Sequence, residues 1–284
     1  MGAVNAATNP DPESSMTGAP PAPPVRWARY VAMGDSFSEG LWDPYPDAPD
    51  IQRGWADNLA AALSARRIAA GHEPLEYANL AIRGRKLRPI IAEQLDATID
   101  AQPDLVSLVG GGNDILRPSA DVEAISDALE NAVTMLRSTG ADVLMGTGFK
   151  AGAALSWTNG RAGAFNANVW SIARRHDAHV LDLWGMRSLG DLRLWSDDRI
   201  HLTPEGHQRV ANAAMVALGL DPEDDAYDAP LDAAPPAAFS DTARANAAWM
   251  RQYVGPWVRR RLTGTSSGDG RTAKWPTPQR WTHP

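Results

Sequence analysis

The chain has 284 residues, of which 44% are hydrophobic and 21% charged, and a formal net charge of −7 at pH 7. This size and composition allow one good-sized buried core, and the acidic balance argues against nucleic acid as a general partner. No apolar run approaches the roughly 20 residues of a transmembrane segment. Cysteine is absent, which excludes disulfides and thiolate metal sites.

Residues 1–25 are rich in Ala, Pro, Asn and Ser and show no hydrophobic periodicity. We therefore expect a disordered N-terminal leader. No basic region followed by an apolar stretch is present, so the sequence predicts no signal peptide and a cytoplasmic location.

From Trp27 onward, short apolar runs alternate with segments of helical spacing. The predicted strands are 29–33, 75–80, 104–109, 142–147 and 179–183. The predicted helices are 53–70, 86–100, 121–138, 160–176 and 204–218. Such alternation predicts an α/β fold, a three-layer α/β/α sandwich with a central parallel sheet of about five strands.

The C-terminal part of the chain differs from the rest in composition. Residues 221–240 are rich in Pro, Ala and Asp and are predicted to be a linker after a domain at 26–220. Residues 241–284 are predicted to form a helix and a basic tail, the helix carrying an apolar stripe of Ala248, Trp249, Tyr253 and Trp257. We expect this region to dock on its own domain, with a contact to a partner, membrane surface or anionic substrate as the alternative.

Four polar segments together resemble the separated parts of a hydrolytic site. They are Gly34-Asp35-Ser36, Asn79 to Gly84, Gly111 to Asp114, and Asp198 to His201. A serine hydroxyl needs a base, a histidine base needs a carboxylate, and the tetrahedral intermediate needs N–H donors. Taken alone, the first segment could equally be a helix cap; the set of four favours acyl-transfer chemistry.

These segments resemble the sequence blocks of the GDSL/SGNH hydrolases, a family of esterases and lipases with a flavodoxin-like fold. The first block is matched by Gly34 to Gly40, the second by Asn79 to Gly84, the third by Gly111 to Asp114, and the last by Asp198 and His201. The resemblance covers roughly residues 26–220, and Ser38 stands where threonine is commoner.

The resemblance implies a role for each residue. Ser36 would be the nucleophile, His201 the general base and then the acid, and Asp198 its orienting partner. The N–H groups of Ser36 and Gly84 and the side chain of Asn113 would form the oxyanion hole. Asp35 and Asp114 are expected to hold loops together through backbone hydrogen bonds. We expect no cofactor and no metal.

Four aromatic residues are candidates for substrate binding. Trp42 and Tyr45 directly follow the nucleophile block and could form one wall of a site; Trp184 and Trp195 precede the histidine block and could form the opposite wall. The alternative is that these rings pack in the core or on loops. His207 is expected to pack or cap within the last predicted helix.

The sequence therefore predicts a serine ester hydrolase that acts through an acyl-enzyme on small-molecule or carbohydrate esters. One alternative is an acyltransferase that uses the same triad with a sugar or another alcohol as acceptor. Another is a non-catalytic binding protein on a hydrolase fold. The acyl length, the alcohol moiety and the oligomeric state are left open.

Overall fold

The computed structural model of this chain describes residues 25–233, 244, 247, 249–254 and 266–283. The leader predicted over 1–25 lies outside this part of the chain except for Val25, and so do Ala248 and Trp257 of the predicted apolar stripe.

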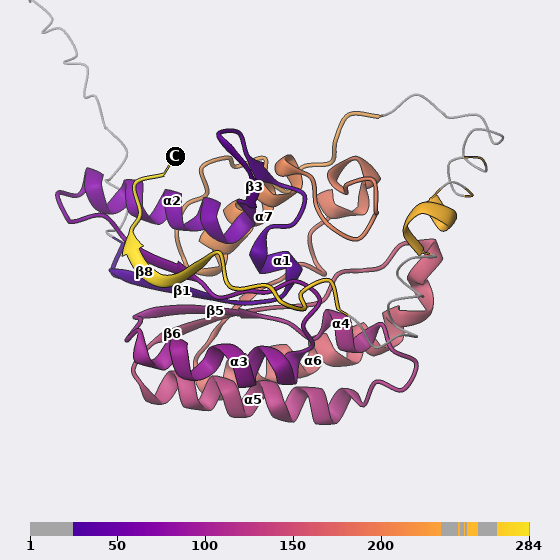
Figure 1. The fold of residues 1–284 in the computed structure, drawn as a ribbon, viewed down its shortest axis with the longest axis horizontal. Helices are drawn as coiled ribbons and strands as arrows, with labels where there is room; N and C mark the ends of the chain where they lie inside the picture. Colours follow the sequence, from indigo (N-terminus) through magenta and orange to yellow (C-terminus); the bar gives the residue numbers. More distant parts are fainter. Residues whose placement is uncertain (1–24, 234–243, 245–246, 248, 255–265, 284) are drawn as a thin grey trace, which may run out of the picture.

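A six-stranded sheet in the order β7-β6-β5-β1-β4-β8 forms the middle layer (Figure 1). The strands are β1 (Arg29–Gly34), β4 (Glu76–Asn79), β5 (Leu105–Val109), β6 (Asp142–Gly146), β7 (His179–Leu181) and β8 (Trp275–Arg280). The first five run parallel, whereas β8 is antiparallel to β4 at the edge of the sheet. The five predicted strands are therefore confirmed, and β8 is additional.

Helices cover both faces of this sheet and complete the predicted three-layer α/β/α fold (Figure 1). On one face lie α2 (Gly54–Ala69) and α7 (Pro204–Ala217). On the other lie α3 (Leu87–Asp100), α5 (Val122–Ser138) and α6 (Asn159–His176). Each face has its own hydrophobic core, because the buried strands present apolar side chains in both directions.

Several shorter elements were not foreseen from hydrophobic periodicity. They are α1 (Ser36–Glu39), the hairpin of β2 (Pro44–Tyr45) and β3 (Ala48–Gln52), α4 (Gly112–Ile115), the 3₁₀ turns η1 (Ala153–Thr158), η2 (Ser188–Gly190) and η3 (Leu192–Leu194), and the π-helical turn η4 (Met250–Val254). They lie in the connections between the long elements, and α1 and α4 follow the C-terminal ends of β1 and β5.

The ends of the described chain belong to the domain. Val25 is buried, Tyr227 and Leu231 of the predicted linker pack against the core beside α2 and α7, and Trp281 is completely buried. Residues 275–280, which the sequence placed in a basic tail, form β8 at the edge of the sheet. Within the described residues, no helix combines the length and the apolar character that crossing a membrane requires.

Candidate active site

Ser36 begins α1 directly after the central strand β1. The Asp35 carboxylate caps this short helix by accepting a hydrogen bond of 3.1 Å from the Phe37 N–H. A Cβ on Gly34 would lie 2.5 Å from the Ser38 Oγ and 2.6 Å from the Val109 carbonyl oxygen, so only glycine fits here. The turn therefore holds Ser36 at the carboxyl end of the sheet, where α/β folds of this kind place their ligands.

The loop before α7 brings His201 and Asp198 to this serine. The His201 Nε2 lies 2.8 Å from the Ser36 Oγ, and its Nδ1 lies 2.6 Å from the Asp198 Oδ2. These contacts connect residues 165 positions apart in one chain of hydrogen bonds. The arrangement has the geometry of a nucleophile, a base and an orienting carboxylate.

Hydrogen bonds keep the Asp198 carboxylate ionised. Its Oδ1 accepts from the N–H groups of Ile200 and His201 at 2.9 and 3.0 Å and from the Ser196 hydroxyl at 2.8 Å. Burial alone would raise the pKa of Asp198, but the hydrogen bonds and the charge of His201 outweigh it and hold the pKa at about 2. A carboxylate in this state can stabilise an imidazolium at neutral pH.

Two tryptophans contact Asp198, and neither contact could be predicted from the sequence. The Trp42 indole N–H donates to Asp198 Oδ2 at 2.9 Å, and the Trp249 indole N–H donates to the Asp198 carbonyl oxygen at 2.9 Å. The Arg199 guanidinium also lies over the Trp249 ring, 5.2 Å from its centroid. Trp42 thus contacts the oxygen that also faces His201, and Trp249 joins the C-terminal region to this loop.

Asn113 lies in α4 and points back toward the turn that carries Asp35 and Ser36. Its amide nitrogen donates to Asp35 Oδ2 and to the Arg85 carbonyl oxygen, each at 3.0 Å. An oxyanion bound here would share one of these two hydrogens, because an amide nitrogen carries only two. Burial raises the pKa of the Asp35 carboxyl to about 6, although the hydrogen bonds that it accepts act to lower this pKa.

The loop that carries Gly84 is joined to α1 by an ion pair. Gly84 has a left-handed backbone with φ of 75°. The preceding residue, Arg83, donates its backbone N–H to Glu39 Oε2 at 2.7 Å, and its guanidinium pairs with the same carboxylate. Both side chains are mostly buried, so this pair fixes the loop relative to α1. Asp114 likewise holds a loop, because it accepts the Leu87 N–H at 2.9 Å.

The four aromatic residues predicted to bind substrate do not come together. Trp184 packs with the core on the α3, α5 and α6 face, whereas Trp195 packs with the core on the α2 and α7 face, against Phe149. The Tyr45 hydroxyl donates to the buried Asp57 at 2.8 Å. Trp184 and Trp195 thus pack with different cores and do not form one wall. A substrate contact stays a prediction for these rings, and Trp42 is 39% exposed.

His207 is completely buried and contacts the loop after α1. Its Nδ1 accepts the Trp55 N–H, and its Nε2 donates to the Leu41 carbonyl oxygen, both at 3.2 Å. Burial lowers the pKa of His207 to about 4, so the ring is neutral. It therefore packs within α7, as the sequence suggested.

In the described part of the chain, no group of three or more His, Cys, Asp or Glu side chains is arranged to hold a metal ion.

The fold and this site define a class of protein, three-layer α/β/α hydrolases with a serine after a central strand of the sheet. The chain belongs to the GDSL-like Lipase/Acylhydrolase family, which it matches over residues 32–209. It is thus a serine ester hydrolase of the GDSL/SGNH type. A comparison with curated proteins finds no match.

Solved structures share the fold. The chain is 19% identical to Axe2, an acetylxylan esterase from Geobacillus stearothermophilus, covering 68% of this chain and 94% of that one with a TM-score of 0.58. It is 23% identical to LAE5, an alpha/beta hydrolase enzyme from the metagenome of Lake Arreo in Spain, covering 68% and 95% of the two chains with a TM-score of 0.57. For TesA the values are 21% identity, 67% and 97% coverage, and a TM-score of 0.54.

Proposed function

We propose that this protein hydrolyses carboxylic esters through an acyl-enzyme on Ser36, with His201 as general base and Asp198 as its orienting carboxylate. The observation that carries the proposal is the continuous hydrogen-bond chain from the Ser36 Oγ through His201 to Asp198, with distances of 2.8 and 2.6 Å. Nothing in a merely structural role requires these three groups to line up at the end of the central strand.

The geometry also supports the order of proton transfers. Because His201 Nδ1 faces a carboxylate and donates its hydrogen there, Nε2 is free to accept the Ser36 proton. The serine oxygen then attacks the ester carbonyl carbon, and the imidazolium returns the proton to the departing alkoxide. Water repeats these steps in the second half-reaction and releases the acid from Ser36.

The oxyanion of each tetrahedral intermediate would be bound by the N–H groups of Ser36 and Gly84 and by the Asn113 amide. Ser36 is at the N-terminus of α1, and Gly84 and Asn113 are held near it by the Glu39–Arg83 pair and by the Asn113–Asp35 hydrogen bond. Fixed donors of this kind each contribute roughly 3–4 kcal/mol to catalysis.

The substrate class that we propose is a small-molecule or carbohydrate ester. One structural neighbour is an acetylxylan esterase, which makes acetylated sugars a natural first test. The half-exposed Trp42 ring beside the triad supports this choice, because an aromatic face can contact a sugar ring or an acyl chain.

The test is the Ser36→Ala variant assayed with p-nitrophenyl esters of increasing chain length and with acetylated sugars. We expect kcat to fall by about 10³-fold or more while the melting temperature is kept, since only a hydroxyl is removed. A serine-directed fluorophosphonate should label the parent and not the variant. Ser171→Ala, on the exposed side of α6, is the matched control and should behave like the parent.

A Ser36→Ala protein that keeps more than about a tenth of the parent rate would exclude Ser36 as the nucleophile. Product analysis with added alcohols separates hydrolysis from acyl transfer. If a sugar or another alcohol replaces water as the main acceptor, the acyl-enzyme stands but the hydrolase assignment fails.

A further inference from the structure

Residues 266–283 reach the candidate site although they lie beyond residues 32–209, which match the family. Figure 1 draws this segment in yellow, running past α1 and ending in β8 and the C-terminus. It contacts the site at two places, one beneath the nucleophile helix and one beside Gly84.

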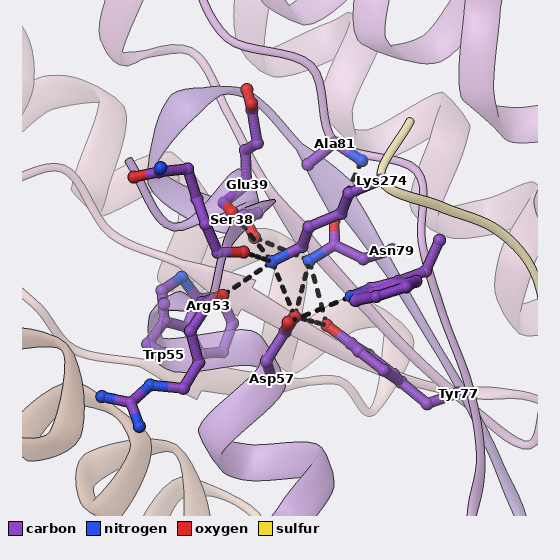
Figure 2. A network of polar contacts seen from close by, with 12 residues as sticks. Ser38, Glu39, Arg53, Trp55, Asp57, Tyr77, Asn79, Ala81 and Lys274 are labelled. Carbon is purple, nitrogen blue, oxygen red and sulfur yellow. Dashed lines mark hydrogen bonds and ion pairs between the residues drawn. The ribbon is translucent and has the colours of Figure 1, made fainter. Parts of the chain in front are cut away.

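Beneath the nucleophile helix, Lys274 inserts its ammonium group into a buried cluster (Figure 2). The Nζ lies 2.8 Å from Asp57 Oδ1 and donates to the carbonyl oxygens of Glu39, Gln52 and Arg53 at 2.9, 2.6 and 2.6 Å. Glu39 ends α1, Gln52 ends β3 and Arg53 caps α2, so a single cation joins the ends of three elements. Burial lowers the pKa of Lys274, and the neighbouring carboxylate opposes this effect.

Asp57 is the centre of this cluster and is fully buried. Besides Lys274, Asp57 accepts a hydrogen bond of 2.8 Å from the Tyr77 hydroxyl (Figure 2). It also accepts the Tyr45 hydroxyl at 2.8 Å and the Trp275 indole N–H at 3.1 Å. A buried carboxylate with this many donors holds its surroundings in one arrangement, and loss of its cation would leave an uncompensated charge. The cluster therefore fixes where the chain enters β8.

Beside Gly84, residues 266–269 form a tight turn that packs on the backbone of the second sequence block. A Cβ on Gly84 would lie 2.5 Å from the Ser266 Oγ, and a Cβ on Gly268 would lie 2.1 Å from the Arg83 carbonyl oxygen. Asp269 closes the turn by accepting the Ser266 N–H at 2.7 Å and contacts the Arg85 guanidinium at 3.3 Å. There is no space between this turn and the Gly84 loop for a single added methyl group.

We propose that residues 266–274 are a positioning element of the active site: Lys274 holds the segment beneath the nucleophile helix, and the turn at Ser266–Asp269 fixes the Gly84 N–H for the oxyanion. The inference rests on the proposed function, in which Gly84 is an oxyanion donor. A shift of the Gly84 N–H by a fraction of an ångström weakens a donor that acts on the transition state, so the loss should appear in kcat and not in KM.

The decisive variant is Gly268→Ala, whose methyl group displaces the turn from the Arg83 carbonyl. We expect kcat to fall by about 10- to 100-fold, with KM within about threefold of the parent and with an unchanged pH profile. Gly160→Ala is the matched control, because a Cβ there meets no atom within 4 Å. If Gly268→Ala does not fold, Asp269→Asn takes its place, since it removes the ion pair with Arg85 and keeps an acceptor for Ser266.

A second variant tests the lysine. Lys274→Met combined with Asp57→Asn removes both charges, so it avoids an unpaired buried carboxylate and should fold better than Lys274→Met alone. We expect the double variant to show the same loss in kcat. Folded Gly268→Ala and double variants with kcat within twofold of the parent would overturn the inference. If Ser36→Ala is inactive in that case, the proposed function stands and only the positioning role fails.

Discussion

The hydrogen bond of the Trp42 indole can be tested separately from the packing of its ring. Its indole N–H donates to Asp198 Oδ2, the oxygen that also faces His201 Nδ1. In Trp42→Phe that oxygen loses a hydrogen bond that helps to hold the carboxylate in place against the His201 ring. We expect kcat to fall a few-fold, with KM within about twofold of the parent.

Trp170→Phe is the control for this prediction, because Trp170 is exposed on α6 and 46% accessible. A Trp42→Phe enzyme with a raised KM and an unchanged kcat would instead make the ring a substrate contact, as the sequence suggested.

Asp198 also connects the site to the acid stability of the protein. Its folded-state pKa of about 2 lies below the ordinary value of 3.8. A depressed carboxyl pKa stabilises the folded state above pH 3.8, and this contribution disappears as the pH falls through about 2. Because the group is partly solvated, we expect about 1–2 kcal/mol.

Urea unfolding of the parent and of Asp198→Asn between pH 2 and pH 6 measures this contribution. The free energies of unfolding should differ most above pH 4 and converge toward pH 2. A difference that does not change over this range would mean that the carboxylate charge is not what stabilises the loop.

At the scale of elements, β8 is an edge strand that depends on one buried side chain. Trp281 follows β8, is completely buried, and meets the Tyr77 ring edge to face with a centroid distance of 4.7 Å. Trp281→Ala should lower the free energy of unfolding by about 3–5 kcal/mol, since the cavity lies in the core. Calorimetry of Trp281→Ala beside Trp170→Ala checks this, because the exposed tryptophan should cost much less.

Trp281→Phe refines the same prediction. The Trp281 indole N–H finds no acceptor among the described residues, so phenylalanine removes an unsatisfied donor along with some apolar surface. We expect Trp281→Phe to lower the free energy of unfolding less than Trp281→Ala does. Equal losses for the two variants would show that the indole N–H is satisfied, for example by water.

At the scale of the whole molecule, the C-terminal segment makes the domain larger than its family match. A chain that ends at residue 240 lacks β8, Trp281 and Lys274, and it leaves Asp57 buried without its cation. Loss of one partner of a buried ion pair costs about 3–5 kcal/mol, in addition to the lost core contacts. We expect such a protein to melt far below the parent or to aggregate.

Thermal unfolding and ester hydrolysis of the truncated protein decide this point. A truncated chain that melts and turns over substrate like the parent would mean that residues 241–284 are dispensable, and it would also remove the basis for the positioning element.

The sequence by itself determined the five parallel strands, the five long helices and the order of the candidate site residues. These features rest on local physics, namely buried apolar runs, helical spacing and caps such as Thr203, which accepts the Gly206 N–H at the start of α7. The motif glycines and the Asp198–His201 spacing are local as well, so they could be recognised without a fold.

Only the tertiary structure decided how distant segments meet. Pro276 and Pro278 argue against a strand in the sequence, yet β8 forms because an edge strand tolerates proline. Likewise, Trp42 contacts Asp198, which lies 156 residues further along the chain. Lys274 contacts Asp57 across more than 200 residues. No pattern along the chain encodes these pairings, because each contact forms only when the layers pack and enclose both partners.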